Sequence, residues 1–217
     1  MRYKFTLKSI SPLLMHADDV ELADRLSVER KAAKNKAVSK AGDDRFPAWS
    51  WQTYCYSDGK QIVIPSENLS ACLLQAGATM KGNKGKSLKE ASQPGLAFDE
   101  SMFVLLANGK PVPISAIEAT KDATFPEQCE LVKPLGFSLF IKRARVGTSK
   151  HVRVRPRFEN WSISGTVETF VPELTADVLA ELFRIAGFSK GLCDWRPGSP
   201  TKPGPFGRFE AELSPIK

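Results

Sequence analysis

The chain has few of the residues that build metal sites and disulfide frameworks. It contains four scattered cysteines, none in a C-x-x-C pair, and only two histidines, His16 and His151. A secreted disulfide framework of this length would carry denser cysteines, and a zinc site would need clustered thiols or imidazoles. We therefore expect no metal, no cofactor and a reducing, cytoplasmic location.

Long apolar runs are missing as well. No stretch approaches the roughly 20 apolar residues that span a bilayer. The opening MRYKFTLKSI alternates charged and apolar residues, unlike the apolar core of a signal peptide. We also find no Ser-His-Asp set and no phosphate-binding loop. The sequence therefore predicts no membrane association and no convincing active site.

What the chain does have is an excess of positive charge and enough apolar residues for one core. Its 217 residues are 42% hydrophobic, and 31 Lys and Arg outnumber 24 Asp and Glu, which gives a net charge of +7. An excess of this size is a weak indication of an anionic partner by itself. Its distribution along the chain carries more information.

Hydrophobic periodicity predicts strands alternating with two helices. Tyr3, Phe5 and Leu7 alternate with charged residues, as in a half-buried strand over 2–10. Ser66 and Thr175 are natural N-caps for helices over 66–77 and 175–185. Further strands are expected at 98–106, 136–146, 150–157, 162–171 and 206–213, and a thinly apolar helix within 20–40.

This order predicts an α+β fold: a ferredoxin-like (RRM-like) antiparallel sheet with two helices. We expect the chain to form a single domain over 1–217, with large basic insertions at about 18–60 and about 78–135. Residues 18–46 and 81–95 have little to bury, so we expect them to be mobile segments.

The strongest local signal is KRARVGTSKHVRVRPR, residues 142–157, which reads as a basic hairpin without an acidic residue. Its cations are Lys142, Arg143, Arg145, Lys150, Arg153, Arg155 and Arg157. Like charges on neighbouring strands repel unless counter-charge is supplied, and arginine forks suit phosphate oxygens. We therefore predict that these arginines lie side by side and bind the backbone of single-stranded RNA or DNA. The alternative is a solvated hairpin face, partly paired with Asp or Glu from elsewhere in the chain.

Two other basic segments would extend that surface, unless they are simply solvated loops. They contribute Lys31, Lys34 and Lys36, and Lys81, Lys84 and Lys86. If about six phosphates are neutralised in all, the logarithm of the affinity falls with the logarithm of the salt concentration with a slope near −4. The aromatics Trp49, Trp51, Tyr54 and Tyr56 could stack bases or, at strand spacing, belong to the core.

A long segment rich in glycine and proline, GLCDWRPGSPTKPGPFGRFE (191–210), joins the last predicted helix to the last strand. Such connections are normally short, so this one indicates a functional loop or an interface. Its glycines would let a backbone approach a ligand closely. The candidate residues of this glycine-rich loop are Gly191, Trp195, Arg196, Gly204, Phe206, Gly207 and Arg208.

The layout resembles the RAMP superfamily (repeat-associated mysterious proteins), whose members build CRISPR effector complexes. Members carry a loop of the form G-h-G, a spacer and G-F-G-x-h between the last helix and the last strand. Here Gly191-Leu192-Cys193 and Gly204-Pro205-Phe206-Gly207-Arg208-Phe209 are similar, but Cys193 replaces a glycine and Pro205 is interposed. Pro12-Leu13-Leu14-Met15-His16 and Ile64-Pro65-Ser66 also resemble the family's first strand and helix start. Small phage and mobile-element proteins have a similar tail.

The resemblance implies a non-catalytic subunit that binds guide RNA with its basic face. Such subunits form homo-oligomers along the strand, contact other CRISPR effector subunits, and use a mobile insertion as a thumb. Some relatives cleave RNA with a histidine, which makes His16 the candidate for a metal-independent endoribonuclease. The same basic surface would also suit a single-stranded DNA-binding protein of phage recombination, or a protein–protein module with an acidic partner.

Overall fold

The computed structural model describes residues 1–18, 20–32, 42–82, 85, 87–146 and 149–216, apart from the side chains at 22, 146 and 149. Four of the predicted binding residues, Lys34, Lys36, Lys84 and Lys86, therefore lie outside the described residues. Within the described ranges the chain folds into antiparallel sheets and several helices, so the α+β class is confirmed.

The main sheet has six strands in the order β11-β1-β10-β6-β7, with β4 also paired to β10, and all its pairs are antiparallel. β1 is central because it pairs with β10 on one side and with β11 on the other. The strands are β1 (Arg2–Ser9), β4 (Leu96–Phe98), β6 (Leu106–Ala107), β7 (Lys110–Pro111), β10 (Trp161–Thr169) and β11 (Phe209–Pro215).

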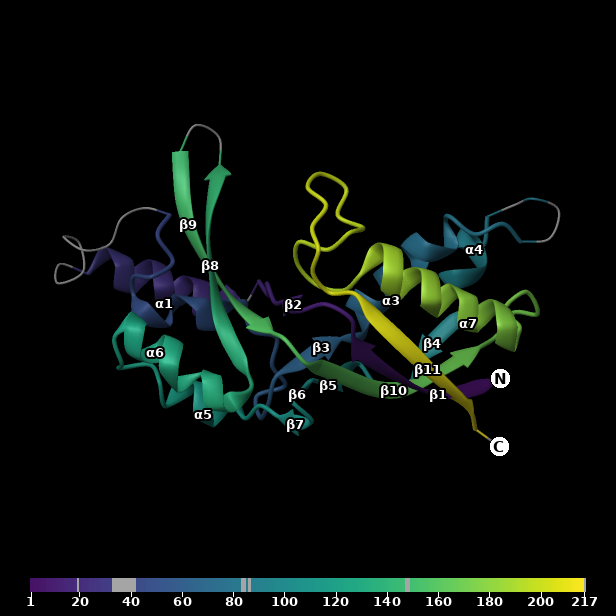
Figure 1. The fold of residues 1–217 in the computed structure, drawn as a ribbon, viewed down its shortest axis with the longest axis horizontal. Helices are drawn as coiled ribbons and strands as arrows, with labels where there is room; N and C mark the ends of the chain where they lie inside the picture. Colours follow the sequence, from purple (N-terminus) through teal and green to yellow (C-terminus); the bar gives the residue numbers. More distant parts are fainter. Residues whose placement is uncertain (19, 33–41, 83–84, 86, 147–148, 217) are drawn as a thin grey trace.

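Two helices, α3 (Ser66–Gly77) and α7 (Ala176–Ile185), cover one face of this sheet (Figure 1). The alternation of β1 points Tyr3, Phe5 and Leu7 toward them, and all three are buried. The Phe5 ring lies 5.8 Å from the Phe183 ring of α7. The half-buried strand predicted over 2–10 is thus confirmed, since one face of β1 packs in the core and the other is exposed.

The opposite face of the main sheet is polar and open. On β1, β10 and β11, all fully described, the outward positions hold only charged or hydroxyl side chains. Lys8 pairs with Glu212 at 2.5 Å, and the hydroxyls of Thr6 and Ser164 lie 3.0 Å apart. RRM modules bind RNA by stacking bases on aromatics of the sheet. These three strands present no such aromatic outward.

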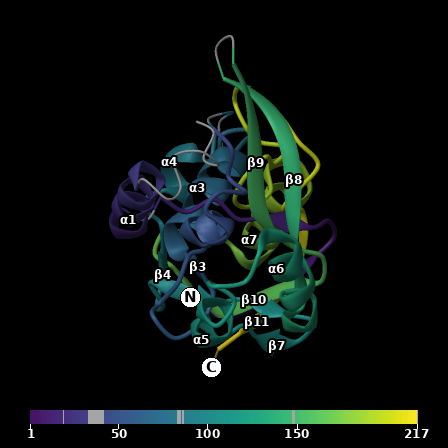
Figure 2. The same ribbon diagram turned by 90° about the vertical axis from the view of Figure 1, so that its left-hand side faces the viewer.

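A second sheet has the order β2-β9-β8 and is dominated by one long hairpin. β8 (Phe137–Val146) and β9 (Ser149–Phe158) project from the body, as the two perpendicular views show (Figures 1 and 2). At its base the hairpin is anchored by apolar packing, because Phe137, Val154 and Phe158 are buried in the core. β2 (Leu13–Leu14) pairs with the base of β9, and Asp43 forms a bridge with Val152 farther up.

The remaining helices and strands are distributed along the whole length of the molecule (Figure 1). They are α1 (Val20–Lys31), η1 (Ala48–Tyr54), β3 (Val63–Pro65), α4 (Lys89–Ser92), β5 (Met102–Val104), α5 (Ile114–Glu118), α6 (Phe125–Leu131), η3 (Lys133–Leu135) and η4 (Ala186–Lys190). β3 pairs with β5, and a turn at Asp58 precedes β3, with its carboxylate accepting from the amides of Lys60 and Gln61.

Several local predictions need correction. Residues 98–106 form short separate strands, and β4 and β6 pair with β10, so part of the segment 78–135 belongs to the main sheet. Ser66 is the first helical residue, and Pro65 holds the N-cap position. Gly187 does not end the last helix, because the chain continues in the π turn η4. The segment 81–95 is partly structured, since it includes α4 and the buried Leu88. Among the described residues, no helix combines the length and apolarity that crossing a bilayer requires.

Candidate nucleic-acid interface

The register of the hairpin places its cations on both faces. Directly opposite residues share a face in an antiparallel pair. Lys142 lies opposite Arg153, whereas Arg143 lies opposite Val152 and Arg145 opposite Lys150. The alternation along β9 therefore puts Arg153, Arg155 and Arg157, here called the arginine row, on the face shared with Lys142. Arg143, Arg145 and Lys150 lie on the other face, so the prediction that all the arginines lie side by side is wrong.

Each member of the arginine row forms an ion pair with a carboxylate of the chain itself. Arg153 lies 3.3 Å from Asp44, Arg155 lies 2.8 Å from Asp194, and Arg157 lies 2.6 Å from Glu159. The Asp44 side chain is only 1% exposed and also faces Arg30 of α1 at 3.6 Å. For these three arginines the geometry favours the internally paired alternative, and their binding to phosphate stays a prediction.

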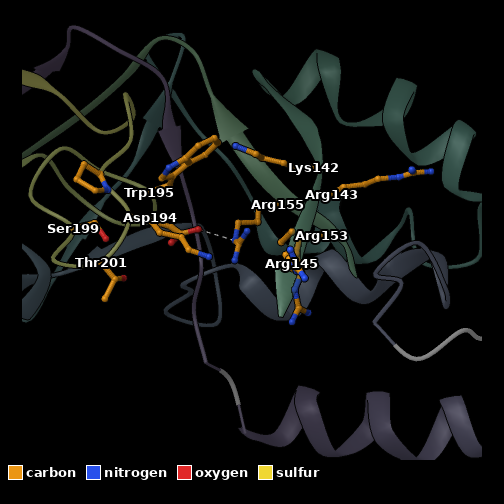
Figure 3. Close-up of a pocket in the computed structure, with 12 residues that line it drawn as sticks. Lys142, Arg143, Arg145, Arg153, Arg155, Asp194, Trp195, Ser199 and Thr201 are labelled. Carbon is orange, nitrogen blue, oxygen red and sulfur yellow. Dashed lines mark ion pairs between the residues drawn. The ribbon is translucent and has the colours of Figure 1, made fainter. Parts of the chain in front are cut away.

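A cleft of about 660 Å³ separates the hairpin from the glycine-rich loop (Figure 3). Among the residues that the structure describes, its basic lining residues are Lys142, Arg143, Arg145, Arg153, Arg155 and Lys202, and its one acidic lining residue is Asp194. Trp195, Ser199 and Thr201 complete the loop side, whereas the Arg143 side chain points away from Trp195 (Figure 3). The size falls within the roughly 300–1,000 Å³ typical of ligand clefts. Its charge suits an anionic ligand.

A smaller cleft of about 340 Å³ lies beside the other face of β9. Arg143, Lys150 and His151 line it together with Arg45 and Asp43, and Arg45 bonds to Asp43 at 2.6 and 2.9 Å. Arg143 and Lys150 are exposed and take part in no ion pair with the described residues. The outer part of the hairpin therefore offers cations toward two clefts.

The glycine-rich loop is held by hydrogen bonds to β2 and to Pro12 just before it. The amide of Asp194 donates to the Leu14 carbonyl at 3.0 Å, and the amide of Gly207 donates to the Pro12 carbonyl at 2.7 Å. A Cβ on Gly204 would lie 2.2 Å from the Trp195 carbonyl oxygen. This glycine is thus required by packing of the loop on itself, so close approach of a ligand is not needed to explain it.

The two arginines of the loop turn back onto the protein. Arg196 donates to the Cys193 carbonyl at 3.3 Å, and the Arg208 guanidinium lies over the Phe188 ring at 5.3 Å. Gly191 adopts a φ of +69°, and Phe206 packs its ring 5.5 Å from Trp195. Of the loop residues predicted from sequence, only Trp195 lines the large cleft.

His16 lies next to the arginine row. Its Nδ1 is 3.4 Å from Arg155 Nη2, and its ring meets the Tyr54 ring edge-on at 4.8 Å. Although the residue as a whole is exposed, partial desolvation of the imidazole, followed by the nearby positive charge of Arg155, lowers its pKa. A neutral imidazole can accept a proton, but His16 is not among the residues that line the cleft.

The aromatics that precede the Asp58 turn belong to the body of the protein. Trp49 and Trp51 are buried in η1, a 3-10 helix, and Trp51 Nε1 donates to Gln128 at 2.5 Å. Tyr54 donates to Asp44 at 3.0 Å, and Tyr56 donates to the His16 carbonyl at 3.1 Å. The two tryptophans are therefore core residues, and strand spacing was the wrong period for this segment.

The flanking basic segments lie at different distances from the hairpin. Lys31 is exposed at the end of α1, next to Arg30, which reaches Asp44. Lys81 is exposed before α4, and α4 lies at the far end of the long axis of the molecule from β8 and β9 (Figure 1). Lys31 is thus placed to extend the basic surface, whereas α4 is remote from it (Figure 1).

Sequence reasoning missed Asp44 and Asp194. Neither was among the candidate residues, and each meets its arginine only through the tertiary fold. Within the described residues, no cluster of three or more His, Cys, Asp or Glu side chains could hold a metal ion. Comparison with models of known families and with curated proteins found no match to the chain.

Proposed function

We propose that the chain is a non-catalytic protein that binds single-stranded nucleic acid, with guide-type RNA as the preferred ligand. One observation carries this proposal: within the described part of the chain, six basic residues and one acidic residue line the cleft between the hairpin and the glycine-rich loop. The phosphates of the bound nucleic acid lie along the outer hairpin, where Lys142, Arg143 and Lys150 are exposed. The arginine row serves mainly to build the wall, because its charge is met by Asp44, Asp194 and Glu159.

We further propose a ferredoxin-like core for this fold. The strand order β11-β1-β10-β4, with α3 and α7 on one face, supports that proposal. The similarity of the loop 191–209 to the RAMP pattern supports membership of a CRISPR-like assembly or of a related phage system. In such an assembly the chain forms homo-oligomers along the strand and contacts other effector subunits.

Filter binding across a salt series tests the proposal. Six neutralised phosphates give a log–log slope near −4 for a single strand, and each lost contact reduces it by about 0.7. The triple variant Arg143→Gln, Lys150→Gln, Lys202→Gln should therefore bind a single-stranded 20-mer with a slope near −2. It leaves the contact between Lys142 and Trp195 in place.

A matched control removes the same charge elsewhere. Lys4, Lys60 and Lys110 are exposed and lie outside both basic clefts, so changing all three to Gln should leave the slope unchanged. Equal losses in the two triple variants would overturn the proposal, since binding would then follow net charge alone. RNA and DNA oligomers of one sequence separate the two ligands, because only RNA offers the 2′-hydroxyl.

A second candidate, a metal-independent endoribonuclease, rests on His16. Its lowered pKa favours the neutral base at physiological pH, and Arg155 lies close enough to stabilise an anion. His16→Ala should abolish cleavage of a labelled RNA and leave binding intact. If the unmodified protein with added EDTA leaves the RNA whole, this candidate is rejected.

A further inference from the structure

Trp195 differs from the other tryptophans of the chain in its exposure. Trp49, Trp51 and Trp161 are 4%, 0% and 2% exposed, respectively, and pack in the core. Trp195 is only partly buried, and it lines the cleft opposite the hairpin (Figure 3). An indole at the wall of a basic cleft is a surface on which a flat ligand can stack.

The indole is covered by a cation that could leave it. Lys142 Nζ lies 3.0 Å from the centroid of the Trp195 ring, and the lysine is otherwise exposed (Figure 3). An exposed ammonium gains little from an aromatic face and gains more from a phosphate oxygen. A strand that enters the cleft would therefore draw Lys142 onto its backbone and uncover the ring.

Two further aromatic rings pack against the Trp195 ring. Phe206 and Phe140 pack at 5.5 and 6.3 Å from it, with interplanar angles of 38° and 43°. Trp195 adopts a φ of +46°, a conformation that costs a bulky residue free energy and is found where surrounding structure enforces it. Here the packing of Gly204 on the Trp195 carbonyl supplies that constraint.

The remaining wall suits the edge of a base. Ser199 and Thr201 present hydroxyls, which can both donate and accept, and Lys202 adds a further cation. Together these residues place a stacking surface, adaptable polar groups and phosphate-binding cations around one space. Single-strand binding proteins combine a basic groove with aromatic side chains in the same way.

We propose that Trp195 is the stacking platform for one unpaired nucleobase, and that Lys142 moves from the ring to the adjacent phosphate when the strand binds. This inference rests on the proposed function, because it presupposes that the strand occupies the cleft. It adds that the protein distinguishes a strand with bases from a bare sugar–phosphate chain.

Two probes of equal length and charge test the inference: a single-stranded oligouridylate 12-mer and a 12-mer of abasic ribose phosphates. We expect the base-containing probe to bind about tenfold more tightly and to quench part of the tryptophan fluorescence. The quenching would report Trp195, since the other three tryptophans are buried. Trp195→Leu should remove both the quenching and the tenfold preference.

Two further variants keep the test decisive. Trp195→Phe retains an aromatic face and should keep most of the preference, even if the leucine variant folds poorly. Lys142→Ala should weaken both probes equally and preserve the preference. A preference that is unchanged in both Trp195 variants, or absent from the wild type, overturns the inference while backbone binding stands. If neither probe binds the wild type, the proposed function fails and the inference fails with it.

Discussion

The ion pair between Arg153 and Asp44 should contribute to stability more than to ligand binding. Asp44 is 1% exposed and Arg153 is 29% exposed, with 3.3 Å between their charged atoms. Arg153→Gln leaves this buried carboxylate with Arg30 at 3.6 Å and the Tyr54 hydroxyl at 3.0 Å. The variant therefore removes only part of the interactions that stabilise the Asp44 carboxylate.

Breaking a buried pair by removing one partner costs about 3–5 kcal/mol when nothing else compensates the remaining charge. Because Arg30, the Tyr54 hydroxyl and the Val154 amide remain as partners of Asp44, we expect about 2 kcal/mol, the range of a hydrogen bond to a charged group. For a chain of this length, that lowers the melting temperature by roughly 4–8 °C. Exposed Arg143 offers the contrast, since Arg143→Gln should change the free energy of unfolding by no more than about 0.5 kcal/mol.

Thermal unfolding and oligonucleotide binding, measured on the same two variants, separate these roles. Arg153→Gln should have a lower melting temperature and bind single-stranded nucleic acid normally. Arg143→Gln should keep its melting temperature and bind single-stranded nucleic acid more weakly. Asp44→Asn and the double variant Arg153→Gln, Asp44→Asn complete a mutant cycle, with a coupling of about 1–2 kcal/mol expected. If Arg153→Gln kept its melting temperature and lost as much affinity as Arg143→Gln, the reasoning would be refuted.

Three further predictions concern the parts that support the site. Gly204→Ala places a Cβ 2.2 Å from the Trp195 carbonyl oxygen and should cost about 1–3 kcal/mol in urea unfolding; an unchanged midpoint would contradict the packing argument. Gln128→Leu removes the acceptor of the Trp51 indole N–H at a fully buried position, and calorimetry should show a loss of about 1–3 kcal/mol. Partial desolvation and then Arg155 lower the pKa of His16, so the unfolded chain takes up a proton there more readily. Acidification from about pH 7.5 to about pH 5.5 should therefore destabilise the wild type more than His16→Asn, and identical pH dependence in the two proteins would count against this.

Elements with a strong local pattern could be predicted from the sequence. The alternation of Tyr3, Phe5 and Leu7 identifies β1, and Thr175 caps α7 by accepting from the Val178 amide at 3.4 Å. The basic hairpin also lies where its pattern predicts, from 137 to 158. In each case the information is contained within a few neighbouring residues, so tertiary contacts were not needed to read it.

Features that depend on distant contacts could not be predicted. Arg153 and Asp44 are 109 residues apart, and nothing near either one indicates the other. The tryptophans of η1 are two residues apart, which fits a strand, yet their burial is decided by packing against α6. Charge density along the sequence therefore located the hairpin correctly but could not say which of its cations were already neutralised.

The positive charges of the hairpin have two kinds of partner, one that stabilises the fold and one that a ligand can replace. Lys142 and Arg153 lie directly opposite each other, an arrangement that repels unless each charge is met. Arg153 is met by a buried carboxylate, which persists in the free protein, whereas Lys142 is met by the Trp195 ring, a weaker partner that a phosphate can replace. The permanent counter-charge on Arg153 keeps the two β-strands paired without a ligand. The Trp195 ring is an exchangeable partner, so Lys142 remains available to a polyanion. The salt dependence of binding should therefore follow cations such as Lys142, and the melting temperature should follow cations such as Arg153.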